Sequence, residues 1–329
     1  MSSNKDNLPW IEKHRPKQLD EIIDHAEKVT SLKGLIDADQ LPHLLFSGPP
    51  GTGKTSLILS LARYMYGTNY RKYILEINGS SERGIDTVRG TIMSFIQNKS
   101  DKVKIVILDE AEALTNEAQG ALKSVIEKGV AYCRFCLICN DVNKIIPALQ
   151  SRCTKFPFSY LSKSSMKNKL LDISRIEGIN IEEDAIDVLL ELERDFRQLL
   201  NILQGIHIYY GSVSPDTTIQ VKDIYNYLGK PTDKSVNEVI HSLFNDTFDE
   251  ACTLLQSMSL SGHINISDLV LSLSNKLVRI KLKPDKLYFL IQILSDVEKK
   301  SRTGGSTQIL IYLLASAFLK VRHEISNDC

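Results

Sequence analysis

The sequence predicts an α/β domain built on a parallel sheet, followed by two all-helical domains. Three observations lead to this fold class. Short, continuously apolar runs alternate with helical patterns between about residues 43 and 158. A glycine-rich turn joins the first apolar run to the first long helix, and after Tyr160 the strand pattern stops. Strands that are apolar on both faces and separated by helices are typical of a parallel sheet covered by helices.

The elements of the first domain follow this alternation in order. Strands are predicted at 43–47, 73–78, 103–108, 134–140 and 154–158. Helical stretches are predicted between them, near 54–66, 84–98, 116–128 and 143–150. Because the strands are continuously apolar, we expect them to be buried on both faces of the sheet.

The remainder of the chain is predicted to be helical. Serines at 162, 164 and 165 provide caps for a helix entry, and Gly178 and the turn at 211–215 separate later helices. Helices are predicted near 164–177, 182–193, 195–210 and 220–228, with helical periodicity continuing through 232–329. The segment Gly229-Lys230-Pro231 marks a second boundary, so we predict domains at 1–162, 163–230 and 231–329.

Composition excludes some classes of protein. Lysine plus arginine number 40, and aspartate plus glutamate also number 40, so no overall field attracts nucleic acid and any DNA binding must come from local patches or an assembly. No apolar run approaches the roughly 20 residues of a membrane span. The first residues lack the apolar core of a signal peptide. We therefore expect a soluble, intracellular protein with no membrane partner.

The most specific motif is Gly48-Pro49-Pro50-Gly51-Thr52-Gly53-Lys54-Thr55. It lies between a predicted strand and a predicted helix, which is the context that a P-loop requires. Glycines allow backbone N–H groups to surround phosphates, and the helix N-terminus adds the positive end of its dipole. Lys54 is placed to neutralise the β- and γ-phosphates, and the Thr55 hydroxyl to hold Mg²⁺. The motif predicts binding of a nucleoside triphosphate.

The strand at 103–108 ends in two carboxylates, Asp109 and Glu110. Alone, such an ending usually marks a strand that reaches solvent. Paired with a P-loop at this spacing, it is typical of a Walker B motif, in which Asp109 reaches Mg²⁺ and Glu110 polarises the attacking water as a general base.

Residue patterns alone do not decide the roles of three further residues. Asn140 follows a strand and either orients the water and senses the γ-phosphate or is an ordinary turn residue beside Asp141. Arg152, before the last strand, and Arg197, at the start of a helix, are either surface charges or nucleotide ligands.

Cys133, Cys136 and Cys139 have a spacing that suggests a metal or cluster site. They fall in a predicted buried strand, where alternate side chains face opposite ways, so Cys136 points away from the other two. We therefore interpret these thiols as small core residues.

Together, the motifs resemble those of replication factor C small subunits, the sliding-clamp loader family within the AAA+ ATPases. The match is nearest to the third small subunit in the yeast naming, and it covers nearly all of residues 7–230. The motifs that carry the resemblance are Pro9-Trp10-Ile11-Glu12-Lys13-His14-Arg15-Pro16, the P-loop, Leu108-Asp109-Glu110-Ala111, Arg83-Gly84-Ile85-Asp86, Ser151-Arg152-Cys153 and Asp195-Phe196-Arg197. The implied fold is an AAA+ sheet domain, a helical lid and a helical collar that closes a five-membered ring.

The resemblance also implies roles for individual residues. Asn140 and Arg197 become the first and second sensors of the γ-phosphate, and Arg152 becomes an arginine finger that acts on ATP held by the adjacent subunit. The implied contacts to ATP and Mg²⁺ are Ile11, Arg15, Ile23, Gly48, Pro49, Pro50, Gly51, Thr52, Gly53, Lys54, Thr55, Ser56, Asn140 and Arg197, with Thr55 and Asp109 as the metal ligands.

The implied partners are other loader subunits in a heteropentamer, a sliding clamp of the proliferating cell nuclear antigen type, and primer–template DNA, in the nucleus. Arg83 and Arg89 match positions that hold DNA phosphates without reading sequence. The stretch 91–98 is equally compatible with clamp contact and with core packing. His14 departs from the family pattern, because a tyrosine is usual there. The rival functions are another AAA+ enzyme, such as a branch-migration helicase or remodeller, and a scaffold that binds ATP without hydrolysing it.

Overall fold

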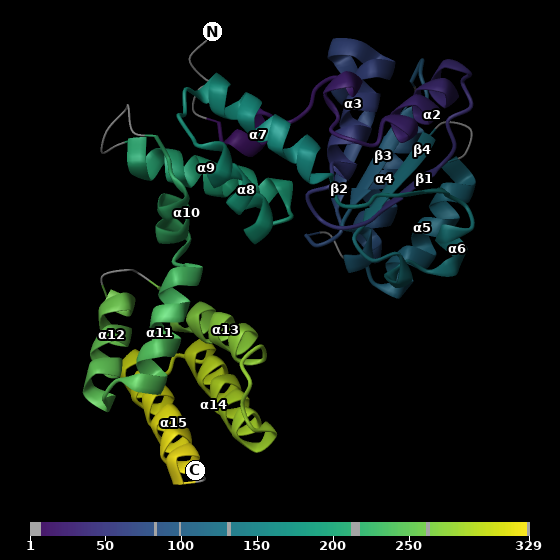
Figure 1. Ribbon diagram of the computed structural model, residues 1–329. Coiled ribbons are helices and arrows are strands. Elements are labelled where there is room, and N and C mark those ends of the chain that lie inside the picture. Colours follow the sequence, from purple (N-terminus) through teal and green to yellow (C-terminus); the bar gives the residue numbers. More distant parts are fainter. Residues whose placement is uncertain are drawn as a thin grey trace. The chain divides into compact units, whose positions relative to one another are not determined.

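The protein is described by a computed structural model that covers residues 8–81, 84–98, 100–129, 133–211, 218–260 and 264–327. The chain divides into two compact units (Figure 1). The first comprises residues 1–180 and 186–216, and the second comprises residues 181–185 and 217–329. The three-domain division of the sequence stays a prediction.

The first unit contains a five-stranded parallel sheet in the order β2-β3-β4-β1-β5. The strands are β1 (Leu44–Ser47), β2 (Ile74–Asn78), β3 (Lys104–Asp109), β4 (Cys133–Cys139) and β5 (Thr154–Pro157). The predicted parallel sheet is confirmed, and each predicted strand differs from the observed one by no more than one residue at either end. The expected burial on both faces holds for the central strands, but it is wrong for β5, which is largely exposed, and only partly correct for β2, because these two strands form the edges of the sheet.

Helices cover both faces of the sheet (Figure 1). One core joins Phe46, Ile107 and Ile138 to helices α2 (Ala26–Asp37) and α3 (Lys54–Tyr66). The other joins the alternate strand residues, such as Leu45 and Val106, to the opposite set of helices. That set comprises α4 (Ile85–Gln97), α5 (Asn116–Gly129) and α6 (Pro147–Gln150).

The cysteines confirm the strand alternation. Cys133 and Cys139 belong to the core with α5, whereas Cys136 lies in the core with α3. Ile92, in the stretch 91–98, is fully buried, and Phe95 packs against the same core as Cys133. Core packing is therefore what the structure shows for this stretch.

The helical prediction at 143–150 is only partly correct. The segment forms a 3-10 turn, η4 (Val142–Lys144), and then α6, because Pro147 occupies the first position of a new helix. Sequence reasoning also missed α1 (Trp10–Lys13), α2 and three further 3-10 turns. These are η1 (Leu19–Glu21), η2 (Gly67–Lys72) and η3 (Ala111–Ala113).

Helices α7 (Lys163–Glu177), α8 (Glu183–Leu192) and α9 (Phe196–Gly211) follow the sheet. The Ser162 hydroxyl caps α7 by accepting a hydrogen bond from the Ser165 N–H, and Gly178 ends the helix with φ of 71°. The predicted serine cap and glycine stop are confirmed.

The second unit is helical and has its own core, formed by α11 to α15. Its helices are α10 (Val221–Leu228), α11 (Asp233–Asn245), α12 (Phe248–Leu260), α13 (Ile266–Leu277), α14 (Pro284–Arg302) and α15 (Thr307–Asn327). Across the described part of the chain, no helix combines the length and apolar character needed to cross a membrane.

Candidate nucleotide-binding site

The polar residues predicted for catalysis meet at one edge of the sheet. The glycine-rich loop follows β1, Asp109 is the last residue of β3, and Asn140 follows β4. These strands are parallel neighbours, with Asn78 paired to Asp109 and Ser47 to Cys139, so their carboxyl ends share one edge. Ligands of open α/β sheets bind at this edge.

Lys54 is the first residue of α3, directly after the loop, and 7% of its surface is exposed. Its Nζ donates to the carbonyl oxygens of Gly48 at 2.6 Å and Pro49 at 2.7 Å, and to Asn140 Oδ1 at 3.1 Å. Burial lowers the pKa of Lys54, and the nearby Asp109 carboxylate partly opposes this effect. A phosphate would provide stronger, charged acceptors for the same ammonium group.

The loop conformation depends on glycine at the positions where other atoms come close. Gly51 has φ of 70°, and a Cβ built there would lie 1.9 Å from Asp195 Oδ1. That carboxylate accepts the Arg197 N–H at 2.8 Å, which caps the start of α9. The P-loop therefore contacts the beginning of the helix that carries Arg197.

Thr55 and Asp109 fit the role of metal ligands. The Thr55 hydroxyl donates to Asp109 Oδ2 at 2.7 Å, which places a hydroxyl and a carboxylate oxygen side by side. Hard cations such as Mg²⁺ prefer oxygen ligands of this kind. The other oxygen, Asp109 Oδ1, accepts the Glu110 N–H at 2.9 Å.

Glu110 has an unusual backbone conformation. Its φ of 50° and ψ of 42° are left-handed, although it is not a glycine. Such conformations cost about 1–3 kcal/mol and concentrate at functional sites. Glu110 lines the same pocket as Lys54 and Thr55. A carboxylate at this place suits a general base for a water molecule.

The contacts of Asn140 distinguish between a residue that acts at the nucleotide and an ordinary turn residue. Its side chain accepts the hydrogen bond from Lys54, and its backbone N–H donates to Glu112 Oε1 at 2.9 Å. Asp141, rather than Asn140, provides the turn contact, since its carboxylate accepts the Asn143 N–H. The geometry favours a role at the nucleotide over a simple turn role.

The predicted nucleotide ligands mostly line one pocket in the first unit. The loop residues from Pro50 to Ser56 form its floor, and Asp109, Glu110 and Asn140 line it from the sheet. Gly48 and Pro49 do not line it, but their carbonyl oxygens accept the hydrogen bonds from Lys54 Nζ.

Two segments distant in sequence complete the walls of the pocket. Ile11, Arg15 and Ile23 line it from the N-terminal segment, as the resemblance implied. Arg197 lines it from α9 and contributes to lowering the pKa of Lys54, so two cationic side chains face the same space. A polyanion is the ligand that this charge arrangement favours.

Arg152 is separate from this pocket. Its guanidinium donates to the Ala148 carbonyl at 2.8 Å and pairs with the Glu127 carboxylate, and it is not among the lining residues. Arg83 lies outside the described residues. Arg89 is in α4, but its side chain is also outside them.

Sequence reasoning missed several residues of the site. His14, Lys169 and Phe196 also line the pocket. Glu112, which holds the Asn140 N–H, could have been suspected because it lies three residues after Asp109 in the same acidic segment.

Gln119 lies outside the pocket, and sequence reasoning missed its structural role. It lies in the first turn of α5, where a glutamine is normally a surface residue, yet only 1% of its surface is exposed. Its amide donates to the carbonyls of Leu114 and Lys144 and accepts the Ile146 N–H. It therefore joins α5 to the segment that leads to α6.

Comparisons with known proteins agree with this geometry. Residues 44–160 match the model of the ATPase family associated with various cellular activities (AAA), and residues 231–317 match the replication factor C C-terminal domain. The RuvB Holliday junction branch migration motor of Thermotoga maritima is similar in fold, with a TM-score of 0.54 at 17% identity over 75% of this chain and 88% of that one.

Curated relatives match over nearly the whole chain. A probable replication factor C subunit 5 of Dictyostelium discoideum is 40% identical over 98% of this chain and 92% of the relative. Replication factor C subunit 3 of Schizosaccharomyces pombe is 38% identical over 93% of this chain and 89% of the relative. With its P-loop, its acidic strand end and these matches along its length, the chain belongs to the replication factor C family of AAA ATPases.

Proposed function

We propose that the chain is an ATP-hydrolysing subunit of a sliding-clamp loader. With related subunits in a heteropentamer, it binds ATP, helps to open a clamp of the proliferating cell nuclear antigen type, and places the clamp on primer–template DNA in the nucleus. The observation that carries the proposal is that Lys54, Thr55, Glu110, Asn140 and Arg197 all line one pocket. A scaffold that never hydrolyses ATP would not need this set.

Each of these residues has a step in the proposed reaction. Lys54 exchanges its carbonyl partners for phosphate oxygens, and Arg197 contacts the γ-phosphate from α9. Thr55 and Asp109 hold Mg²⁺, which neutralises charge on the phosphates. Glu110 accepts a proton from the attacking water, and the Asn140 amide helps to orient that water.

Arg152 is proposed to act on ATP bound by the neighbouring subunit. Its guanidinium lies apart from the pocket of its own chain and keeps a carboxylate partner, Glu127, at a partly exposed position. A cation contributed in trans would stabilise charge on the transferred phosphoryl group only when two subunits are aligned. Hydrolysis would then depend on correct assembly.

The proposed DNA contacts are non-specific. Arg83 and Arg89 would hold backbone phosphates, so replacing either with alanine should weaken binding equally for unrelated sequences and reduce its salt dependence. A variant that lost affinity for one sequence only would contradict this assignment.

A mixed-subunit ATPase assay tests the proposal. We expect Lys54→Ala to abolish ATP binding at this site, and Glu110→Gln to retain ATP binding but stop hydrolysis there. Arg152→Ala should leave the chain's own ATP affinity nearly unchanged while it slows turnover at the adjacent site. Equal losses at both sites would contradict action in trans.

The assay also separates a loader from a translocating motor. A loader is stimulated by its clamp together with primed DNA ends, whereas a branch-migration enzyme consumes ATP continuously along DNA. ATP turnover that proceeds processively on DNA, independent of the clamp, would overturn the clamp-loader proposal.

A further inference from the structure

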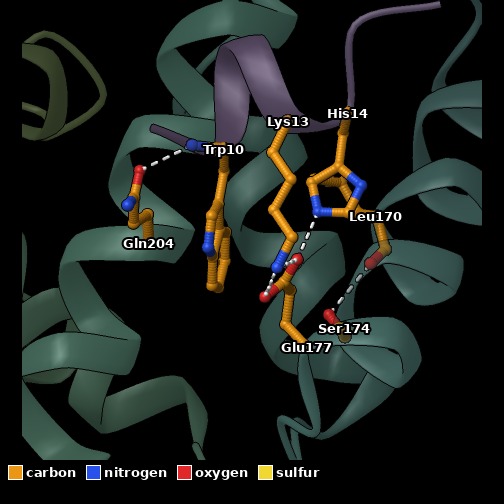
Figure 2. A network of polar contacts seen from close by, with 7 residues as sticks. All are labelled: Trp10, Lys13, His14, Leu170, Ser174, Glu177 and Gln204. Atoms are coloured by element: carbon orange, nitrogen blue, oxygen red, sulfur yellow. Dashed lines mark hydrogen bonds and ion pairs between the residues drawn. The ribbon is translucent and has the colours of Figure 1, made fainter. Parts of the chain in front are cut away.

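Helix α1 is too short to be stable by itself. It has four residues, and isolated helices of that length do not form in water. Its position must therefore come from contacts with the rest of the first unit. Trp10 provides one such contact, since it is 5% exposed and its backbone N–H donates to Gln204 Oε1 of α9 at 3.1 Å (Figure 2). The centroid of its ring also lies 5.4 Å from the centroid of the His207 ring.

Glu177 provides the second contact. Its carboxylate accepts from Lys13 Nζ at 2.8 Å and contacts His14 Nε2 at 2.5 Å, as Figure 2 shows. The Glu177 and His14 side chains are each only 10% exposed. Burial alone would raise the pKa of Glu177, but its hydrogen bonds with Lys13 and His14 bring the pKa below its ordinary value.

The location of this carboxylate is not explained by its own helix. Glu177 is the last residue of α7, where the helix dipole is negative and a carboxylate is unfavourable. Its two cationic or proton-donating neighbours both come from α1 and the residue after it. The contact therefore serves the connection between α7 and the N-terminal segment rather than the stability of α7.

The same segment forms a wall of the nucleotide pocket. Ile11, His14 and Arg15 line the pocket, whereas Trp10 and Lys13 face α9 and α7. His14 both lines the pocket and contacts Glu177 of α7. Any shift of the Glu177 contact would move the pocket wall.

We propose that Glu177 is a positioning residue for the base of the bound nucleotide. By holding Lys13 and His14, it fixes where the apolar side chain of Ile11 and the Arg15 guanidinium meet a purine ring. This inference rests on the proposed ATP binding and assigns part of it to a residue outside the pocket. The phosphates are held by the P-loop, which Glu177 does not contact among the described interactions.

The experiment compares a ligand that has a base with one that lacks it. Full-length chains are titrated with ATP and with inorganic tripolyphosphate. We expect Glu177→Gln to weaken ATP binding by about tenfold, the equivalent of one lost charge-assisted contact, while tripolyphosphate binding changes less than about twofold. Asp172→Asn is the matched control, since it removes a carboxylate from the same helix whose partner, Arg175, is exposed.

A second variant guards against misfolding. Lys13→Met removes the other contact with Glu177 from a residue that does not line the pocket, and it should reproduce the selective loss of ATP binding. Trp10 is the only tryptophan of the chain, so its fluorescence reports whether α1 remains docked in each variant.

The outcomes separate this inference from the function on which it rests. Equal weakening of ATP and tripolyphosphate, or no weakening of either in folded Glu177→Gln, would overturn the positioning role alone. Failure of the unaltered chain to bind ATP would overturn the proposed function as well.

Discussion

Replacing Gly51 with alanine tests whether the P-loop and α9 depend on each other. Gly51 has a left-handed φ of 70°, which costs an alanine about 1–2 kcal/mol. The new Cβ would also lie 1.9 Å from Asp195 Oδ1, so that carboxylate must move away from the Arg197 N–H that it caps. Loss of a helix N-cap costs about 1 kcal/mol. We therefore expect Gly51→Ala to lower the free energy of unfolding of the first unit by about 2–3 kcal/mol.

Gly53→Ala is the matched control. Gly53 is also left-handed, with φ of 89°, but nothing lies within 4 Å of a Cβ built there. Gly53→Ala should therefore lower the free energy of unfolding only through the left-handed backbone conformation, by about 1–2 kcal/mol. Denaturant unfolding without nucleotide, followed through the fluorescence of Trp10, measures both variants. In an Asp195→Ala background the difference between the two costs should shrink, and what remains reflects the Phe196 backbone nitrogen, 3.0 Å from a Cβ at position 51. Equal costs in the unaltered background would refute the reasoning.

Three further predictions use the same chain. Burial, aided by Arg134, lowers the pKa of His43 to about 4, below its ordinary value of 6.5. The unfolded state then binds more protons between these values, so up to about 3 kcal/mol of stability present above pH 6.5 should be lost as the pH falls toward 4. His43→Gln should flatten that decline in denaturant midpoints, and an unchanged slope would contradict the assignment. Gln119→Leu leaves three backbone groups without their partner, so we expect a loss of about 2–4 kcal/mol in urea unfolding; a loss under about 1 kcal/mol would show that these bonds are replaceable. Burial raises the pKa of Cys133 and Cys139 to about 12, so peptide mass spectrometry should find both unmodified after iodoacetamide treatment of the folded chain at neutral pH, and rapid labelling would show that the strand opens.

The sheet could be predicted well because its signals are local. The three central strands, β1, β3 and β4, are short apolar runs that two layers of helices cover. The glycine-rich loop has a required context of strand, turn and helix. The positions of Lys54, Asp109 and Asn140 then follow from parallel pairing, which brings strand ends to one edge.

The missed elements depend on contacts between distant residues. Helix α1 exists because Trp10 and Lys13 dock on residues more than 160 positions later, and no pattern within four residues reveals that. In α2, Leu32 is the one described residue that is fully buried, so its apolar pattern is weak. Local periodicity detects a helix by its buried face, and these two helices present little of one.

Individual site residues differ in the same way. The alternatives for Asn140 could not be separated by its neighbour Asp141, but its hydrogen bond with Lys54, 86 residues earlier, favours the nucleotide role. Glu177 has no sequence signal at all, since a carboxylate at a helix C-terminus looks like an ordinary surface residue until its partners are known.

The left-handed backbone at Glu110 has a consequence for how variants of this residue should be read. Asparagine enters that conformation more easily than glutamine does, because its short amide bonds to the nearby backbone. We therefore expect Glu110→Asn and Glu110→Gln both to lack ATP hydrolysis. The melting temperature of the asparagine variant should be the higher of the two. A higher melting temperature of the asparagine variant would show that glutamate at this position lowers the stability of the fold. The catalytic carboxylate would then be kept for activity at a cost in stability.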